Sequence, residues 1–200
     1  MPDEMNNPDE RRLVQRAAHD PAAFQRLYDL YFRRVYSYVA ARVTHPPDAE
    51  DLVAEIFLQV VKGLPSLSNR HQFSFAAWIF TIARSKVADF YRRDDHRSEG
   101  ELSDTLTITH EFDNRLIEQE RAAEIRNLLD TLSERRREVL MLKYFSGLRN
   151  IEIAQVLGLD ERTVASHLSR GLKDLYDAMT RESAGPHNQQ ENVTGKRNYP

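Results

Sequence analysis

Apolar residues recur at three- and four-residue intervals through most of this 200-residue chain, and that spacing is typical of amphipathic helices. The first run starts at Phe24. Its apolar positions are Leu27, Tyr28, Tyr31, Val35, Tyr38 and Val39. Asp20 and Pro21 precede the run, as expected for an N-cap followed by proline at the first helical position. No segment requires a strand, so the pattern predicts an all-α fold.

A second helix is predicted to begin near Asp48, which with Asp51 forms a variant capping pair, and to end at residues 63–65. Its expected inward residues are Leu52, Val53, Ile56, Phe57, Val60 and Val61. A third helix is predicted from about Phe75 to Arg93. It carries Trp78, Ile79, Ile82, Ala83 and Val87, and this spacing favours a core position for Trp78 over base stacking. The three helices are expected to pack together.

Loss of periodicity divides the chain. Residues 96–115 are rich in Ser, Thr, Asp and Glu, which predicts a flexible acidic linker. We expect one small helical domain before it, over residues 20–95, and a second after it, over residues 116–180. Residues 1–19 are a polar N-terminal segment, and residues 181–200 have too few large apolar side chains to offset the entropy cost of ordering, which predicts a disordered tail.

Composition excludes several classes of protein. The chain has no cysteine, and its seven histidines lack any metal-ligand spacing, so no metal, cofactor or catalytic residue is predicted. No apolar run is long enough to insert in a membrane. The N-terminus is acidic and lacks the features of a secretory signal, so we expect a cytoplasmic protein.

Charge is distributed unevenly around the net value of −3. Residues 44–60 contain four acidic residues and no Lys or Arg, whereas residues 70–97 contain six Lys or Arg against three aspartates. Such segregation is compatible with two partners of opposite charge, although charged runs often form only solvated helix faces.

Residues 151–164 have the spacing of a helix-turn-helix that reads DNA. Ala154 lets the helices approach, Gly158 can adopt positive φ, and Asp160 can cap the second helix. The second helix is expected to turn Val164, Leu168, Leu172 and Leu175 inward. Its outer polar residues, able to reach base edges and phosphates in a major groove, are Arg162, Thr163, Ser166, His167, Arg170 and Lys173. The alternative is ordinary packing of two helices at a glycine.

The chain resembles the extracytoplasmic-function (ECF) sigma factors of the sigma-70 family of bacterial RNA polymerase over about residues 20–95 and 116–178. In the first domain the resemblance rests on Asp48–Glu55 (DAEDLVAE) and on Ser74–Arg84 (SFAAWIFTIAR), followed by Asp89 and the pair Arg92–Arg93. In the second domain it rests on Leu132–Leu140 (LSERRREVL) and the helix-turn-helix. It implies sigma domain two, a flexible linker and sigma domain four, in which the outer polar residues of the helix-turn-helix named above would contact the −35 element of a promoter.

The resemblance also implies partners and surfaces. The expected partners are core RNA polymerase, through its beta and beta-prime subunits, promoter DNA and an anti-sigma factor. The residues implied to bind core polymerase are Asp48, Glu50, Asp51 and Glu55. Those implied to bind the −10 element are Asn69, Arg70, His71, Phe73, Ser85, Lys86, Arg92 and Arg93. An unstacked base needs such polar and aromatic walls, and basic residues neutralise the phosphates.

Two functions from different classes therefore compete. One is a sigma factor that directs core polymerase to the −35 and −10 elements and promotes DNA melting, without being an enzyme. The other is a dimeric helix-turn-helix regulator that binds duplex DNA without polymerase. Symmetry separates them, because a dimer protects an inverted repeat whereas a sigma factor reads two different elements.

Overall fold

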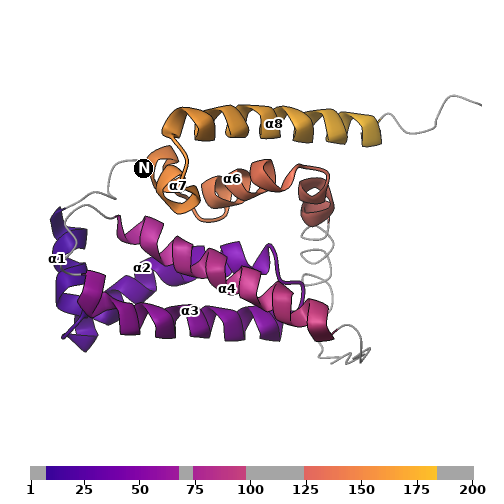
Figure 1. The fold of residues 1–200 in the computed structure, drawn as a ribbon. Helices are drawn as coiled ribbons and strands as arrows, with labels where there is room; N and C mark the ends of the chain where they lie inside the picture. The colour runs from indigo at the N-terminus through magenta and orange to yellow at the C-terminus, as the bar shows by residue number, and fades with distance from the viewer. Residues whose placement is uncertain (1–7, 68–73, 98–123, 184–200) are drawn as a thin grey trace, which may run out of the picture.

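The computed structural model describes residues 8–67, 74–97 and 124–183, and every regular element in those ranges is a helix (Figure 1). The N-terminal domain contains α1 (Pro8–Ala17), α2 (Pro21–Ala40), α3 (Pro46–Leu67) and α4 (Phe75–Arg97). The C-terminal domain contains helical residues 124–130, then α6 (Glu134–Tyr144), α7 (Asn150–Leu157) and α8 (Glu161–Ser183). The predicted all-α fold of two helical domains is confirmed. Most of the predicted linker, and the tail beyond residue 183, lie outside the described residues.

Aromatic side chains fill the core between α2, α3 and α4. Tyr31 meets Phe75 edge to face with ring centroids 4.9 Å apart, and Tyr38 meets Phe80 in the same way at 5.6 Å. Trp78 is half-buried and lies directly over Gly63, where an added Cβ would come within 2.5 Å of its ring. Gly63 therefore allows the indole to pack against α3, and Trp78 belongs to the core as its spacing predicts.

Helix α1 was not predicted, because the segment before residue 20 looks merely polar. In the structure Val14 and Ala17 are buried in the core of the N-terminal domain. The Glu10 carboxylate accepts a hydrogen bond from the Tyr31 hydroxyl, and burial raises the pKa of Glu10. α1 thus belongs to the packed N-terminal domain.

The structure corrects three details of the second predicted helix. It begins at Pro46, so Asp48 lies in its first turn and is not its cap. It continues to Leu67 with Pro65 inside, because a proline so close to the end disturbs only the last turn. Val61 was expected to face inward but is 47% exposed, since its position is about 100° around the helix from buried Val60.

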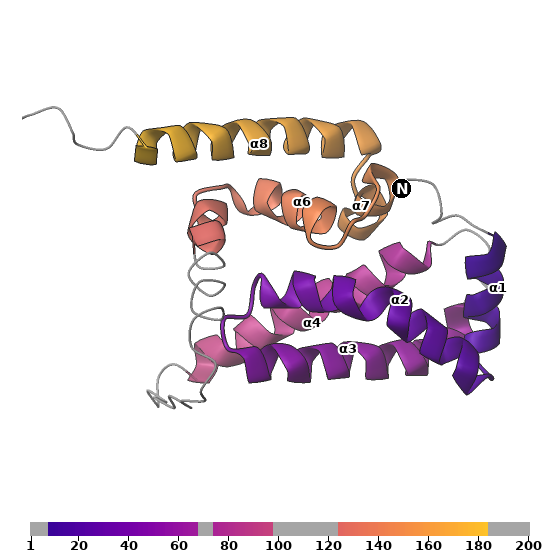
Figure 2. The same ribbon diagram turned by 180° about the vertical axis from the view of Figure 1, so that it is seen from behind.

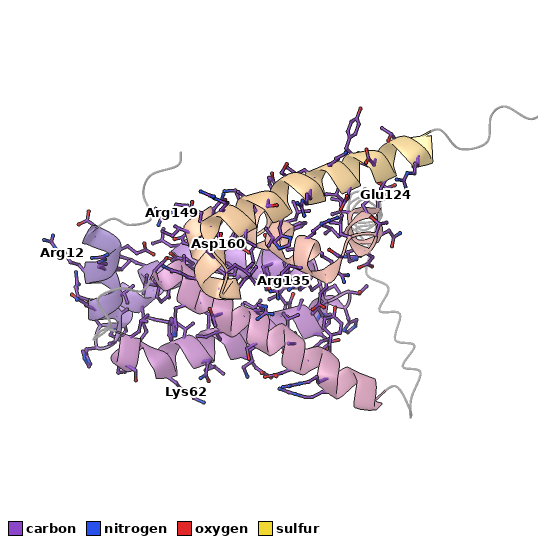
Figure 3. All side chains as sticks on the ribbon, turned by 45° about the horizontal axis from the view of Figure 1, so that its top comes forward. Arg12, Lys62, Glu124, Arg135, Arg149 and Asp160 are labelled. Carbon is purple, nitrogen blue, oxygen red and sulfur yellow. The ribbon has the colours of Figure 1, made fainter. Side chains whose placement is uncertain are left out.

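The predicted turn of the helix-turn-helix is confirmed by its geometry. Gly158 ends α7 with φ of 63°, and the Asp160 side chain accepts hydrogen bonds from the Thr163 backbone N–H at 2.8 Å and the Thr163 hydroxyl at 2.6 Å. These hydrogen bonds lower the pKa of Asp160, with that of the Thr163 hydroxyl the largest contribution. Asp160 therefore caps α8, at the position labelled in Figure 3.

The inward stripe of α8 differs from the prediction at one residue. Val164 is fully buried and Leu168 packs on the core, but Leu172 is 45% exposed. Gly171 takes the inward position instead, where an added Cβ would lie 2.9 Å from a Leu140 methyl group. The absence of a side chain at residue 171 therefore lets α8 lie close to α6.

The two domains pack against each other. α7 lies on α4, and α6 faces the end of α2 (Figure 2). This arrangement places α3 and α8 on opposite outer sides of the molecule, with the domain interface between them (Figures 1 and 2).

Candidate functional site

The predicted acidic surface lies on α3. Glu50 and Asp51 are exposed, Asp48 is half-buried beside His45, whose Nδ1 is 3.3 Å from the carboxylate, and the Glu55 side chain is 43% exposed. Asp51 and Glu55 are one helical turn apart and so share a face. Lys62, seven residues after Glu55, shares this side of α3 by helical spacing, and Figure 3 shows Lys62 pointing away from the C-terminal domain. The helix therefore presents its carboxylates to solvent in one patch.

Two apolar residues that the sequence analysis did not assign to a surface share this face. Leu58 is 60% exposed and lies three residues after Glu55 and seven after Asp51. Val61 follows it on the same side. Leu58 could have been assigned to this face from the sequence, because its spacing from Asp51 and Glu55 is helical. We name this set, Glu50, Asp51, Glu55, Leu58 and Val61, the acidic–apolar face.

The predicted −10 residues on α4 are only partly described. Ser85, Arg92 and Arg93 are exposed, and Arg92 pairs with Asp89. Lys86 is half-buried and its Nζ lies 2.8 Å from Glu55 on α3. The predicted residues Asn69, Arg70, His71 and Phe73 lie outside the described residues.

The Glu55–Lys86 pair joins two surfaces that the sequence analysis treated separately. The hydrogen bond from Lys86 lowers the pKa of Glu55. Glu55 therefore stays ionised at a lower pH than an ordinary glutamate. Its hydrogen bond with Lys86 also joins α3 to α4.

The predicted −35 surface lies along α8. Arg162, Ser166, Arg170 and Lys173 are exposed and recur on one face, whereas Thr163 and His167 are half-buried. The Thr163 hydroxyl donates to Asp160 and so holds the start of the helix. The four exposed residues are thus positioned to reach the phosphates and base edges of a DNA groove.

Within residues 8–67, 74–97 and 124–183, no group of His, Asp or Glu side chains is arranged to hold a metal ion. Across the same described residues, no helix has the length and hydropathy needed to cross a membrane.

Comparison with known proteins agrees with this arrangement. Residues 27–97 match the family model for sigma-70 region 2, and residues 122–175 match that for sigma-70 region 4. α3, which carries the acidic–apolar face, lies within the first match, and α7 and residues 161–175 of α8 lie within the second. α1 precedes both of them.

Relatives with curated names cover most of the chain. The ECF RNA polymerase sigma factor BldN of Streptomyces coelicolor is 32% identical over 167 residues, which are 82% of this chain and 63% of BldN. The chain thus spans a little under two thirds of that relative. The RNA polymerase sigma factor YlaC of Bacillus subtilis is 29% identical over 78% of this chain and 91% of its own.

A solved structure shares the fold. CnrH, in complex with the cytosolic domain of CnrY, superposes with a TM-score of 0.68 at 22% identity, covering 86% of this chain and 97% of that one. The matches to both sigma-70 regions, in order, together with the similarity to ECF sigma factors over most of the chain, show that the chain belongs to the ECF sigma factors of the sigma-70 family.

Proposed function

We propose that this chain is a non-catalytic initiation subunit that docks on core RNA polymerase through the acidic–apolar face and reads promoter DNA through α4 and α8. The observation that carries the proposal is the placement of these surfaces. The acidic–apolar face and the helix-turn-helix lie on opposite outer sides of one chain that matches both sigma-70 regions. One subunit can therefore meet a protein and DNA at the same time.

The acidic–apolar face suits a protein partner. Leu58 and Val61 offer apolar area, and the carboxylates of α3 adjoin them on the N-terminal side, so apolar and charged groups meet on one face as they do in protein interfaces. Opposite charge on the partner increases the association rate and fixes its orientation. We infer that a basic segment of the beta-prime subunit binds here, with Asp48, Glu50, Asp51 and Glu55 as its contacts.

We assign the surface on α8 to duplex DNA and the surface on α4 to single-stranded DNA. Arg162, Ser166, Arg170 and Lys173 on α8 would enter the major groove of the −35 element, with Thr163 and His167 at the edge of the contact. Ser85, Lys86, Arg92 and Arg93 on α4 would follow the −10 strand. Asn69, Arg70, His71 and Phe73 are included in the proposed −10 surface on the basis of the sequence alone.

An inhibitory partner is also proposed. The solved structure of CnrH contains the cytosolic domain of CnrY, and by analogy we propose an anti-sigma factor for this chain. A cytoplasmic location agrees with polymerase and DNA as partners. The alternative of a dimeric regulator is not favoured, because the chain matches sigma-70 region 2 as well as the helix-turn-helix region.

Run-off transcription from fragments of the source genome, with purified core polymerase, tests the proposal. We expect transcripts from a small set of fragments only when the chain is added, each preceded by two different sequence elements. Protection of an inverted repeat by the chain alone, with no polymerase-dependent transcript, would instead establish the dimeric regulator.

A further inference from the structure

The carboxylate of Glu138 on α6 is one of the groups that join the C-terminal domain to the N-terminal domain. Its Oε1 accepts a hydrogen bond from the Tyr38 hydroxyl at 2.9 Å, and its Oε2 is bonded by Arg42. Arg84 on α4 brings its Nε within 3.8 Å of the same Oε1. The side chains of Glu138 and Arg42 are each only 13% exposed, so this charged contact is largely shielded from water.

The cations of this contact depend on the C-terminal domain for their counter-charge. Among the described residues, Arg42 and Arg84 form ion pairs only with Glu138. If the C-terminal domain moved away, the N-terminal domain would keep two neighbouring positive charges with no carboxylate paired to them within the described ranges. Two neighbouring arginines attract an anion in place of the lost carboxylate.

The donors around Glu138 match those that bind phosphate. Guanidinium groups form the same forked hydrogen bonds with phosphate as with carboxylate. Arg42 is held in place because its Nη1 donates to the Tyr38 hydroxyl at 2.6 Å and its guanidinium carbon lies over the Tyr38 ring, 4.4 Å from the centroid. Burial raises the pKa of Tyr38, so its hydroxyl stays protonated and remains able to donate.

Arg84 lies on the same helix as the proposed −10 residues on α4. Lys86, two positions after it, turns to Glu55 of α3 on another side of the helix, whereas Arg92 is two turns further along and only about 80° around from Arg84. A second contact covers the start of the same helix, where the Ser74 hydroxyl donates at 2.8 Å to Glu152 of α7, a residue with no exposed area. The C-terminal domain therefore covers the start of α4 and the side of it that carries Arg84.

We propose that Arg42, Arg84 and Tyr38 form a binding site for a backbone phosphate of promoter DNA, and that Glu138 occupies this site in the closed chain as an internal competitor. The inference rests on the proposed function, because it assigns the site to DNA. It adds a contact outside the predicted −10 and −35 residues, and it makes domain opening and DNA binding parts of one equilibrium.

Separation of the two domains is measured on the chain without polymerase or DNA. Because the protein has no cysteine, Gln59→Cys and Tyr176→Cys place one dye on each domain at exposed positions. Glu138→Gln should lower the energy transfer between the dyes, since it removes the charge while keeping the size of the side chain. Glu134→Gln, at an exposed position one turn earlier on α6, is the matched control and should leave the transfer unchanged.

DNA binding is measured with short fluorescein-labelled DNA of mixed sequence, single- and double-stranded, over a range of salt concentrations. Glu138→Gln should tighten binding about tenfold, the effect of losing one competing charge-assisted hydrogen bond. Adding Arg42→Gln and Arg84→Gln should reverse the gain and reduce the salt slope by about one, because one phosphate contact is lost. Arg33→Gln with Lys62→Gln, at exposed positions away from the domain interface, makes the same change in net charge without reversing the gain.

Two results would overturn the inference. Unchanged energy transfer in Glu138→Gln would show that this carboxylate does not hold the domains together. Opening without any effect of Arg42→Gln and Arg84→Gln on affinity or salt slope would show that the cluster does not bind phosphate. Both measurements use the chain without polymerase. A failure of the proposed function would appear in a different experiment, as a lack of association with core polymerase.

Discussion

Helices α3 and α8 lie on opposite outer sides of the molecule, and the chemistry of their exposed faces is opposite. α3 presents Asp51 and Glu55 beside exposed Leu58, whereas α8 presents Arg162 and Arg170 with hydroxyl-bearing Ser166 between them. A protein partner is bound by apolar area with a charged rim, while DNA is bound through its phosphates and base edges. The comparison shows how a chain with a net charge of −3 can still carry a DNA-binding surface.

The two faces also differ in how their charges are held. Glu55 is bonded to Lys86 of the neighbouring helix, whereas Arg162 and Arg170 form no ion pair within the described part of the chain. The carboxylate on α3 is therefore fixed before its partner arrives. The arginines on α8 retain the freedom to adjust to a DNA groove.

Charge reversal on α3 should have the largest effect. Replacing Asp51 and Glu55 with Lys should abolish association with core polymerase, because like charges across an interface cost several kcal/mol. Pull-down with core polymerase measures this, and circular dichroism checks that the helices remain. Asp29→Lys with Glu124→Lys, at exposed positions on other helices, is the control. Association that survives the α3 reversal would remove this face from the interface.

Loss of the α8 arginines should have an intermediate effect confined to DNA. Arg162→Ala with Arg170→Ala should reduce run-off transcription from promoters that need the −35 element by about ten- to a hundredfold, and leave polymerase association intact. Arg135→Ala, at an exposed position on α6, should change transcription little. Equal transcription by the double variant and the unchanged chain would exclude these arginines from the contact.

Removing the lysine that holds Glu55 should have the smallest effect. In Lys86→Gln the pKa of Glu55 should rise toward its ordinary value, as measured by NMR titration of its carboxyl group. The pair should stabilise the fold by less than ~1 kcal/mol, because it is partly exposed. Because the pKa of Glu55 is lowered in the folded state, this stabilisation is present at pH values above the ordinary pKa of a glutamate. It is lost as the pH falls through the folded-state pKa of Glu55.

An unchanged Glu55 titration in Lys86→Gln would show that the pair does not determine the charge of the acidic–apolar face. The difference in unfolding free energy between Lys86→Gln and the unchanged chain should disappear in acid. A difference that persisted there would point to packing of the lysine stem as its cause.

Local signals made the helix-turn-helix predictable from sequence. Positive φ at Gly158 and the cap at Asp160 depend on residues within a few positions of each other, and both are confirmed. The all-α fold followed from helical spacing in the same way. The site assignments on α3, α4 and α8 stay predictions, although the structure shows that most of the described ones reach solvent.

Features that depend on distant packing were not predicted. Leu172 and Gly171 could not be distinguished as inward residues without knowing that α6 approaches α8 so closely. Helix α1 is stabilised by contacts of Val14 and Ala17 with the core, which its polar sequence does not reveal. The role of Glu138 was hidden for the same reason, because Tyr38 and Arg42 lie about a hundred positions away in the chain.

Co-elution of the purified full-length chain with core RNA polymerase at low salt, with no inhibitor present, tests the central claim most directly. We predict that the chain elutes with the polymerase and that the Asp51→Lys, Glu55→Lys variant elutes alone. Elution of the unchanged chain apart from the polymerase would contradict the account.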